Sequence, residues 1–150
     1  MARAAGRDRE RDRVRRLAAA VARRLSEVYP DARCGLDFQN PWQLLVATVL
    51  SAQCTDERVN RVTPELFLLW PGPAELASAD VEALEAVIRP LGFHRVRTRA
   101  LQAISRLVRD QHRGVVPDRP EALTSLPGVG RKTATVVLGE GYGQAVGVVV

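Results

Sequence analysis

The sequence is poor in cysteine, in aromatic residues and in lysine, and it contains no long apolar run. Two cysteines, Cys34 and Cys54, are too few for a disulfide scaffold and lack the paired spacing of a metal site, so we expect two reduced thiols. No apolar stretch reaches the ~18 residues of a membrane span. The arginine-rich N-terminus also lacks the apolar core of a secretory signal. We therefore predict a cytoplasmic protein without a membrane partner.

Aromatic residues make up only 5% of the chain, and no segment shows the strong apolar–polar alternation of a half-buried strand. Alanine, leucine, valine and arginine dominate instead, and apolar residues recur at helical spacing. The 150 residues, 46% of them hydrophobic, are enough for one ordinary domain with a real core. We predict an all-α fold.

The net charge of +5 is unevenly distributed. Residues 1–16 carry seven arginines against three acids, residues 55–88 seven acids against two arginines, and residues 89–113 seven arginines against one acid. A polyanion would be attracted to one face of such a molecule. The alternative is an ordinary solvated helix surface.

Three parts are expected along the chain. Residues 1–13 are poor in apolar residues and are predicted to form a basic, disordered tail. Residues 14–30 form an amphipathic helix that stops at Tyr29-Pro30, and residues 31–150 form a helical domain. The stripe of the first helix consists of Val14, Leu17, Ala18, Val21, Leu25 and Val28.

The central helix of the domain is predicted over Trp42–Ala52, since Asn40-Pro41 supplies a cap and a first-turn proline and the run that follows is apolar on every side. Later helices are expected to start at Thr55 with an interruption at Pro64, at Ser78, and at Asp118.

The stretch Leu126-Pro127-Gly128-Val129-Gly130-Arg131-Lys132-Thr133-Ala134 is the most informative part of the sequence. Gly128 and Gly130 make a tight turn before a helix whose first N–H groups lack partners and favour an oxyanion. A nucleotide P-loop has a glycine directly before its lysine, and Arg131 at that position excludes this motif. A dinucleotide fingerprint needs a third glycine at residue 133, which is threonine. The remaining interpretation is a hairpin between two short helices that holds a nucleic-acid phosphate.

Lys132 is the single lysine among 22 basic residues. Arginine keeps its proton near neutral pH, whereas a lysine amine can lose it and act as a nucleophile. Chance is the alternative explanation, but the position beside the glycine turn favours a functional amine.

The same stretch resembles the helix-hairpin-helix motif of the endonuclease III family of base-excision repair enzymes. The resemblance extends to Leu50-Ser51-Ala52-Gln53-Cys54-Thr55-Asp56, Leu91-Gly92-Phe93 and Val115-Val116-Pro117, and it covers about residues 14–150. It implies the family's glycosylase fold, a six-helix barrel domain plus an N-terminal helix, with the hairpin motif at about 121–139. It also implies a DNA glycosylase for oxidised pyrimidines with an abasic-site lyase activity.

The family's site residues can be transferred only where the motifs match. Lys132 matches the nucleophile that attacks C1′ of a flipped nucleotide and forms a Schiff base, after which β-elimination cuts the strand. Gln53 matches the residue that fills the gap left by the base, and Phe93 the apolar wedge beside it. The expected DNA-binding set of the hairpin is Gly128, Val129, Gly130, Arg131 and Thr133.

The chain also departs from the family. Its final residues, 148–150, stop just before the catalytic aspartate that the family carries in a Val-Asp-Thr-His segment. The four cysteines of the family's [4Fe–4S] cluster are missing, so we expect no cofactor, a C-terminally truncated fold and a poorly covered stripe on the first helix. The expected partner is double-stranded DNA with a damaged base or an abasic site, bound by a monomer. A non-catalytic helix-hairpin-helix DNA-binding fragment is the alternative.

Overall fold

The computed structural model describes residues 2–147, and the chain divides into two compact units between Cys34 and Gly35. The first unit contains one helix, α1 (Ala2–Val28). The structure thus replaces the tail predicted over residues 1–13 with helix from Ala2 onward. Alanine and arginine are strong helix formers, and an ion pair one turn apart joins Arg13 to Glu10 at 4.0 Å. Low apolar content therefore does not mean low helicity here.

The apolar stripe of α1 is exposed, as the sequence predicts. Val14, Leu17, Val21 and Leu25 are each between 49% and 63% exposed. Within residues 2–34 no second helix covers this stripe, so inside its own unit the helix depends on local propensity.

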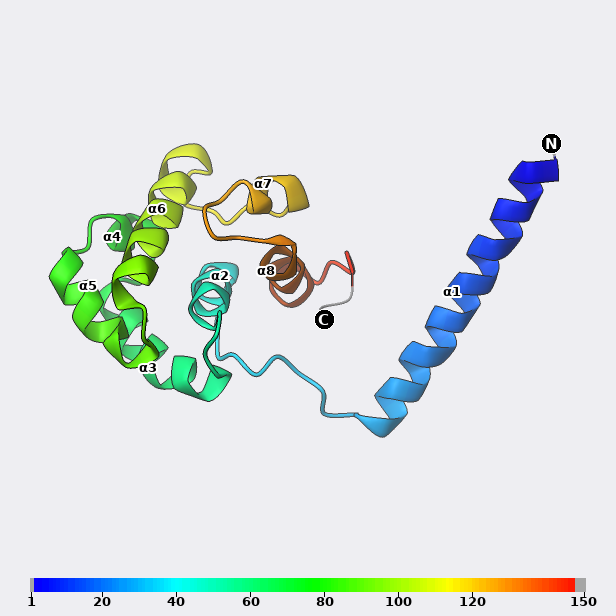
Figure 1. Ribbon diagram of the computed structural model, residues 1–150, viewed down its shortest axis with the longest axis horizontal. Coiled ribbons are helices and arrows are strands. Elements are labelled where there is room, and N and C mark those ends of the chain that lie inside the picture. Colours follow the sequence, from blue (N-terminus) through cyan, green and yellow to red (C-terminus); the bar gives the residue numbers. More distant parts are fainter. Residues whose placement is uncertain (1, 148–150) are drawn as a thin grey trace. The chain divides into compact units, whose positions relative to one another are not determined.

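The second unit is built from short helices and turns, and no strand occurs within residues 2–147, which confirms the all-α prediction. Figure 1 shows α2 between α6 on one side and α8 on the other. The elements are α2 (Pro41–Leu50), α3 (Asp56–Leu69), α4 (Pro73–Ala77), α5 (Val81–Ile88), the 3₁₀ turn η1 (Arg89–Leu91), α6 (His94–Gln111), α7 (Pro120–Thr124), α8 (Arg131–Val136) and the π-helical turn η2 (Val137–Gly141).

Helix α2 is the centre of this unit, as predicted. Asn40 caps it by accepting the N–H of Gln43 at 3.0 Å, and Pro41 occupies the first turn. Leu44, Leu45 and Leu50 are fully buried against α3, α6, α8 and η2. The C-terminal end of this buried helix leads directly into the polar segment with Gln53.

Two other helix predictions are wrong. Helix α3 continues through Pro64, because a proline removes only one N–H donor and the packed face of α3 compensates. Helix α5 starts after Asp80, whose carboxylate accepts the N–H of Ala83 at 2.9 Å, whereas Ser78 ends the short helix α4.

Candidate nucleic-acid interface

Helices α7 and α8 form the predicted hairpin, and the turn between them has an open glycine backbone over a buried anchor. Gly128 has φ +75°, a conformation that only glycine adopts readily. The Val129 side chain is buried at 5% exposure. Gly130 precedes α8 in an extended conformation, and a Cβ built there meets no atom within 4 Å. At residues 128–130 the turn thus presents backbone, and not side chains, to solvent.

The first N–H groups of α8 have no partner within the helix and lie directly after this open backbone. That arrangement suits an oxyanion such as a phosphate. Arg131 is exposed and Thr133 half-buried at the start of the same helix. Val129 is part of the predicted DNA-binding set, but its side chain is buried and its backbone N–H donates to the carbonyl oxygen of Leu126 at 3.1 Å.

Two hydrogen bonds join the segment before α7 to the segment after η2. The hydroxyl of Tyr142 donates to the carbonyl oxygen of Val116, and Nε2 of Gln144 donates to that of Asp118 at 3.2 Å. Burial raises the pKa of Tyr142, with the charge of Asp118 adding to the effect. Asp118 therefore ties the link before the hairpin to the segment after it, and Arg119 occupies the cap position of α7 that the sequence assigned to Asp118.

Lys132 is the second residue of α8, and its side chain is exposed. Lys132 follows Arg131 in the first turn of α8. The part of the chain that the structure describes leaves this side chain open to solvent and to a partner.

Gln53 and Phe93 share an unusual backbone conformation. Their φ angles are +60° and +47°, in the left-handed region, and neither is glycine. Such conformations cost about 1–3 kcal/mol and persist where the surroundings enforce them, often at functional sites. Gln53 is exposed and Phe93 is 70% exposed, so both side chains are available to a partner. No sequence pattern indicates this conformation.

The arginine-rich segment 89–113 contributes to the surface less uniformly than its charge count indicates. Arg97 is buried at 7% exposure, and burial lowers its pKa. Arg109 pairs with Asp110 at 2.6 Å, and Arg95 lies 4.0 Å from Glu85. Arg97 is one helical turn before Leu101 on the apolar face of α6, and this spacing could have revealed its burial.

An iron–sulfur cluster does not fit the residues present. Such a cluster takes four cysteine thiolates, and the sequence has two cysteines. Within residues 2–147, no group of three or more His, Cys, Asp or Glu side chains could hold a metal ion. No helix of the same residues is long and apolar enough to cross a membrane.

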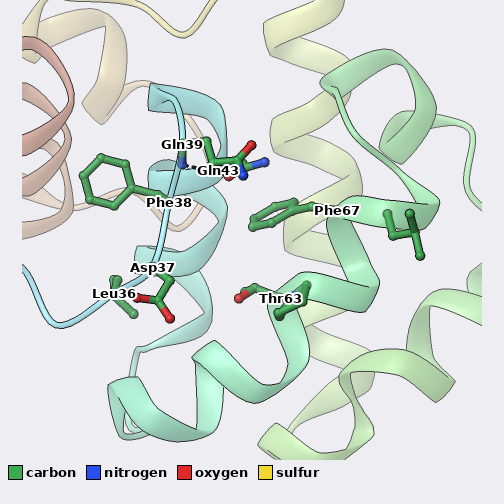
Figure 2. A pocket seen from close by; sticks show the side chains of 9 residues that line it. Leu36, Asp37, Phe38, Gln39, Gln43, Thr63 and Phe67 are labelled. Atoms are coloured by element: carbon green, nitrogen blue, oxygen red, sulfur yellow. Dashed lines mark hydrogen bonds between the residues drawn. The ribbon is translucent and has the colours of Figure 1, made fainter.

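A cavity of about 570 Å³ lies at the N-terminal end of α2, the end opposite Gln53. Figure 2 shows the Phe67 side chain pointing toward Gln43 across it, with Thr63 below. Gln43 is in the first turn of α2, whereas Gln53 follows the last. A ten-residue helix is ~15 Å long, so this cavity is separate from the candidate interface.

Comparison with known proteins identifies the class. Residues 46–149 match the model of the HhH-GPD superfamily base excision DNA repair proteins. Because this match spans more than half of the chain, the protein belongs to that superfamily. Its helix-hairpin-helix motif and all-α fold agree with this membership.

Several similar proteins are endonucleases III, which confirms the resemblance seen in the sequence. Endonuclease III of Synechocystis sp. is 50% identical over 126 residues, which are 84% of this chain and 58% of that protein. The structure of a non-covalent endonuclease III–DNA complex has a TM-score of 0.78 at 40% identity, covering 85% of this chain and 60% of the other. A trapped endonuclease III–DNA covalent intermediate gives the same values. The chain thus spans about three fifths of these relatives.

Proposed function

We propose that this chain is the DNA-binding and nucleophile-bearing part of a base-excision DNA glycosylase for oxidised pyrimidines with abasic-site lyase activity. One observation carries the proposal: the only lysine of the sequence is exposed in the first turn of α8, directly after the open Gly128–Gly130 backbone. A phosphate held by that backbone places the sugar–phosphate chain beside the Lys132 amine.

The chemistry assigned to Lys132 is nucleophilic. Its neutral amine attacks C1′ of the flipped nucleotide, the glycosidic bond breaks, and the base leaves with the bonding pair and takes up a proton. The remaining C1′–N bond becomes a Schiff base as the sugar ring opens. Loss of a C2′ proton then expels the 3′ phosphate by β-elimination, and hydrolysis of the Schiff base frees the lysine.

Gln53 and Phe93 are assigned to the lesion. Both are exposed on strained turns, and an amide and an aromatic ring suit the two tasks of filling a vacated base position and wedging a base step. The DNA-bound state of the similar solved structures supports DNA as the partner of this surface. We also propose that the chain acts in the cytoplasm, at the nucleoid, as a monomer.

Borohydride trapping on a duplex with one abasic site tests the nucleophile. Reduction of a Schiff base gives a covalent protein–DNA adduct, which we expect for the unmodified chain and not for Lys132→Gln. Lys132→Arg is the matched control, because it keeps the positive charge without a nucleophilic amine. An adduct that persists in Lys132→Arg would assign the chemistry to another group.

A non-catalytic DNA-binding module is the second candidate, because the open glycine backbone and the exposed Arg131 suit DNA binding without a covalent step. This candidate predicts salt-dependent DNA binding by soluble chain without any adduct. The same trapping experiment, run beside a binding titration at two salt concentrations, separates the two.

A further inference from the structure

Arg97 connects the start of α6 to the end of α2. Its Nη1 donates to the carbonyl oxygen of Leu50, and its Nη2 donates to that of Ala52 at 2.8 Å. These carbonyls lie just before Gln53, whereas the backbone N–H of Arg97 donates to the carbonyl oxygen of Phe93 at 3.0 Å. One buried side chain thus reaches from the turn with Phe93 to the turn with Gln53.

Arg58 makes the reciprocal connection. It lies in the first turn of α3, which follows the Gln53 turn, and its Nη2 donates to the carbonyl oxygen of Pro90 at 2.6 Å. Pro90 belongs to η1, which leads into Phe93. The two turns are therefore linked in both directions. Arg97, after the Phe93 turn, donates to carbonyls before Gln53, and Arg58, after the Gln53 turn, donates to a carbonyl before Phe93.

We propose that Arg97 and Arg58 are positioning residues, a two-arginine brace that fixes the separation of Gln53 and Phe93. This inference rests on the proposed function for the assignment of Gln53 and Phe93 to the lesion. Two exposed side chains can enter DNA on either side of one base position only if their separation is held before binding.

The chemistry of Arg97 fits positioning better than general stabilisation. Arg97 is buried, its guanidinium donates to two backbone carbonyls, and no group of residues 2–147 accepts a hydrogen bond from its Nε. An apolar side chain would avoid the desolvation of that charge. The guanidinium, however, can donate to two carbonyls at once, and the C-terminal end of α2 carries a partial negative charge that attracts a cation.

The test uses Arg58→Met, Arg97→Met and Arg97→Lys, with Arg106→Met as the control. Arg106 is exposed on α6, so its replacement removes the same charge from the same helix as loss of Arg97 without touching the brace. Arg58 is also exposed, so Arg58→Met keeps the core intact even where an Arg97 variant fails to fold. Arg97→Lys keeps the charge but offers a single donor point.

Hydrogen–deuterium exchange of the chain without DNA is the first measurement. We expect Arg58→Met and Arg97→Met each to speed exchange in both segments, 51–55 and 90–94, and Arg106→Met to leave both unchanged. Faster exchange only in the segment nearer the substitution would overturn the brace. This arm needs no DNA and therefore decides the brace even where the proposed function fails.

The second measurement is the ratio of affinities for an abasic-site duplex and an intact duplex. We expect both brace variants, and also Gln53→Ala, to lower this ratio about tenfold. The affinity for intact duplex should stay within roughly twofold, because the hairpin contacts are unchanged. If the variants exchange faster but keep the same ratio of affinities, the two arginines only stabilise the fold, and their positioning role is overturned. An unmodified chain with a ratio of one would instead refute the assignment of Gln53 and Phe93 to the lesion.

Discussion

Nη2 of Arg97 lies 2.8 Å from the carbonyl oxygen of Ala52, a contact between residues 45 apart in the sequence. It satisfies a backbone group beyond the last turn of α2, which the helix itself leaves without a donor. The contact joins the central helix to the longest helix of the second unit. We therefore expect the stability of this unit to depend on a residue that composition assigns to the surface.

Arg97→Met tests that dependence. The substitution leaves the carbonyl groups of Leu50 and Ala52 without their donor and is expected to lower the free energy of unfolding by about 2 kcal/mol. Urea denaturation followed by circular dichroism measures it. Arg106→Met, an exposed neighbour on α6, should change the midpoint little. Equal effects of the two substitutions would contradict the role of the contact.

The two glycines of the hairpin predict opposite defects. Gly128→Ala forces a side chain into φ +75° and should cost about 1 kcal/mol of stability. The added Cβ of Gly130→Ala meets no atom of residues 2–147 within 4 Å and should leave stability unchanged. The same Cβ should block the approach of a phosphate and weaken DNA binding. Thermal melting and DNA titration of both variants check the pair. Normal DNA binding by folded Gly130→Ala would argue against a phosphate at this turn.

Gln53→Gly separates stability from function. Glycine relieves the strain of φ +60°, so the melting temperature should rise by an amount equivalent to about 0.5–1 kcal/mol. The variant has no side chain to fill a vacated base position, and its preference for abasic-site DNA should fall. Gln53→Ala is the control, because it removes the side chain but keeps the strain. A lower melting temperature for Gln53→Gly than for Gln53→Ala would show that strain at this turn is negligible.

Tyr142→Phe predicts a change in alkaline stability. The pKa of Tyr142 is raised in the folded state by burial, so the folded protein favours the neutral phenol. Its contribution is complete below the unfolded-state pKa of tyrosine and is lost as pH rises through the folded-state value. Tyr142→Phe should lose about 1 kcal/mol at neutral pH, because the Val116 carbonyl loses its donor.

Unfolding curves between pH 7 and pH 11 check this sign. The difference in stability between the unmodified chain and Tyr142→Phe should shrink at the alkaline end. A difference that grows with pH would mean that the folded state favours the phenolate.

The sequence predicted the elements whose signals are local. Asn40-Pro41 defined the start of α2, its unbroken apolar run defined its burial, and the glycine spacing defined the α7–α8 hairpin. The helical start of α1 was missed because hydrophobic patterning does not measure the propensity of alanine and arginine. The continuity of α3 through Pro64 depends on tertiary packing, which no local signal reports.

The site was predicted residue by residue but not in its geometry. Family motifs named Gln53, Phe93 and Lys132, yet nothing in the sequence indicates that the first two have left-handed backbones. The burial of Arg97 was open to prediction, since it shares the face of Leu101, Ile104 and Val108 on α6. Its acceptors at and just beyond the end of α2 could not be predicted, because they lie 45 and 47 residues away along the chain.

The lone, exposed lysine on α8 has a practical consequence. Apart from the N-terminal amine, Lys132 offers the only primary amine in the sequence. An acylating dye or a reductive-methylation reagent therefore marks one side chain, beside the hairpin. The extent of labelling with and without DNA therefore reports whether DNA covers this turn. The measurement needs no engineered cysteine, and no second lysine contributes to the signal.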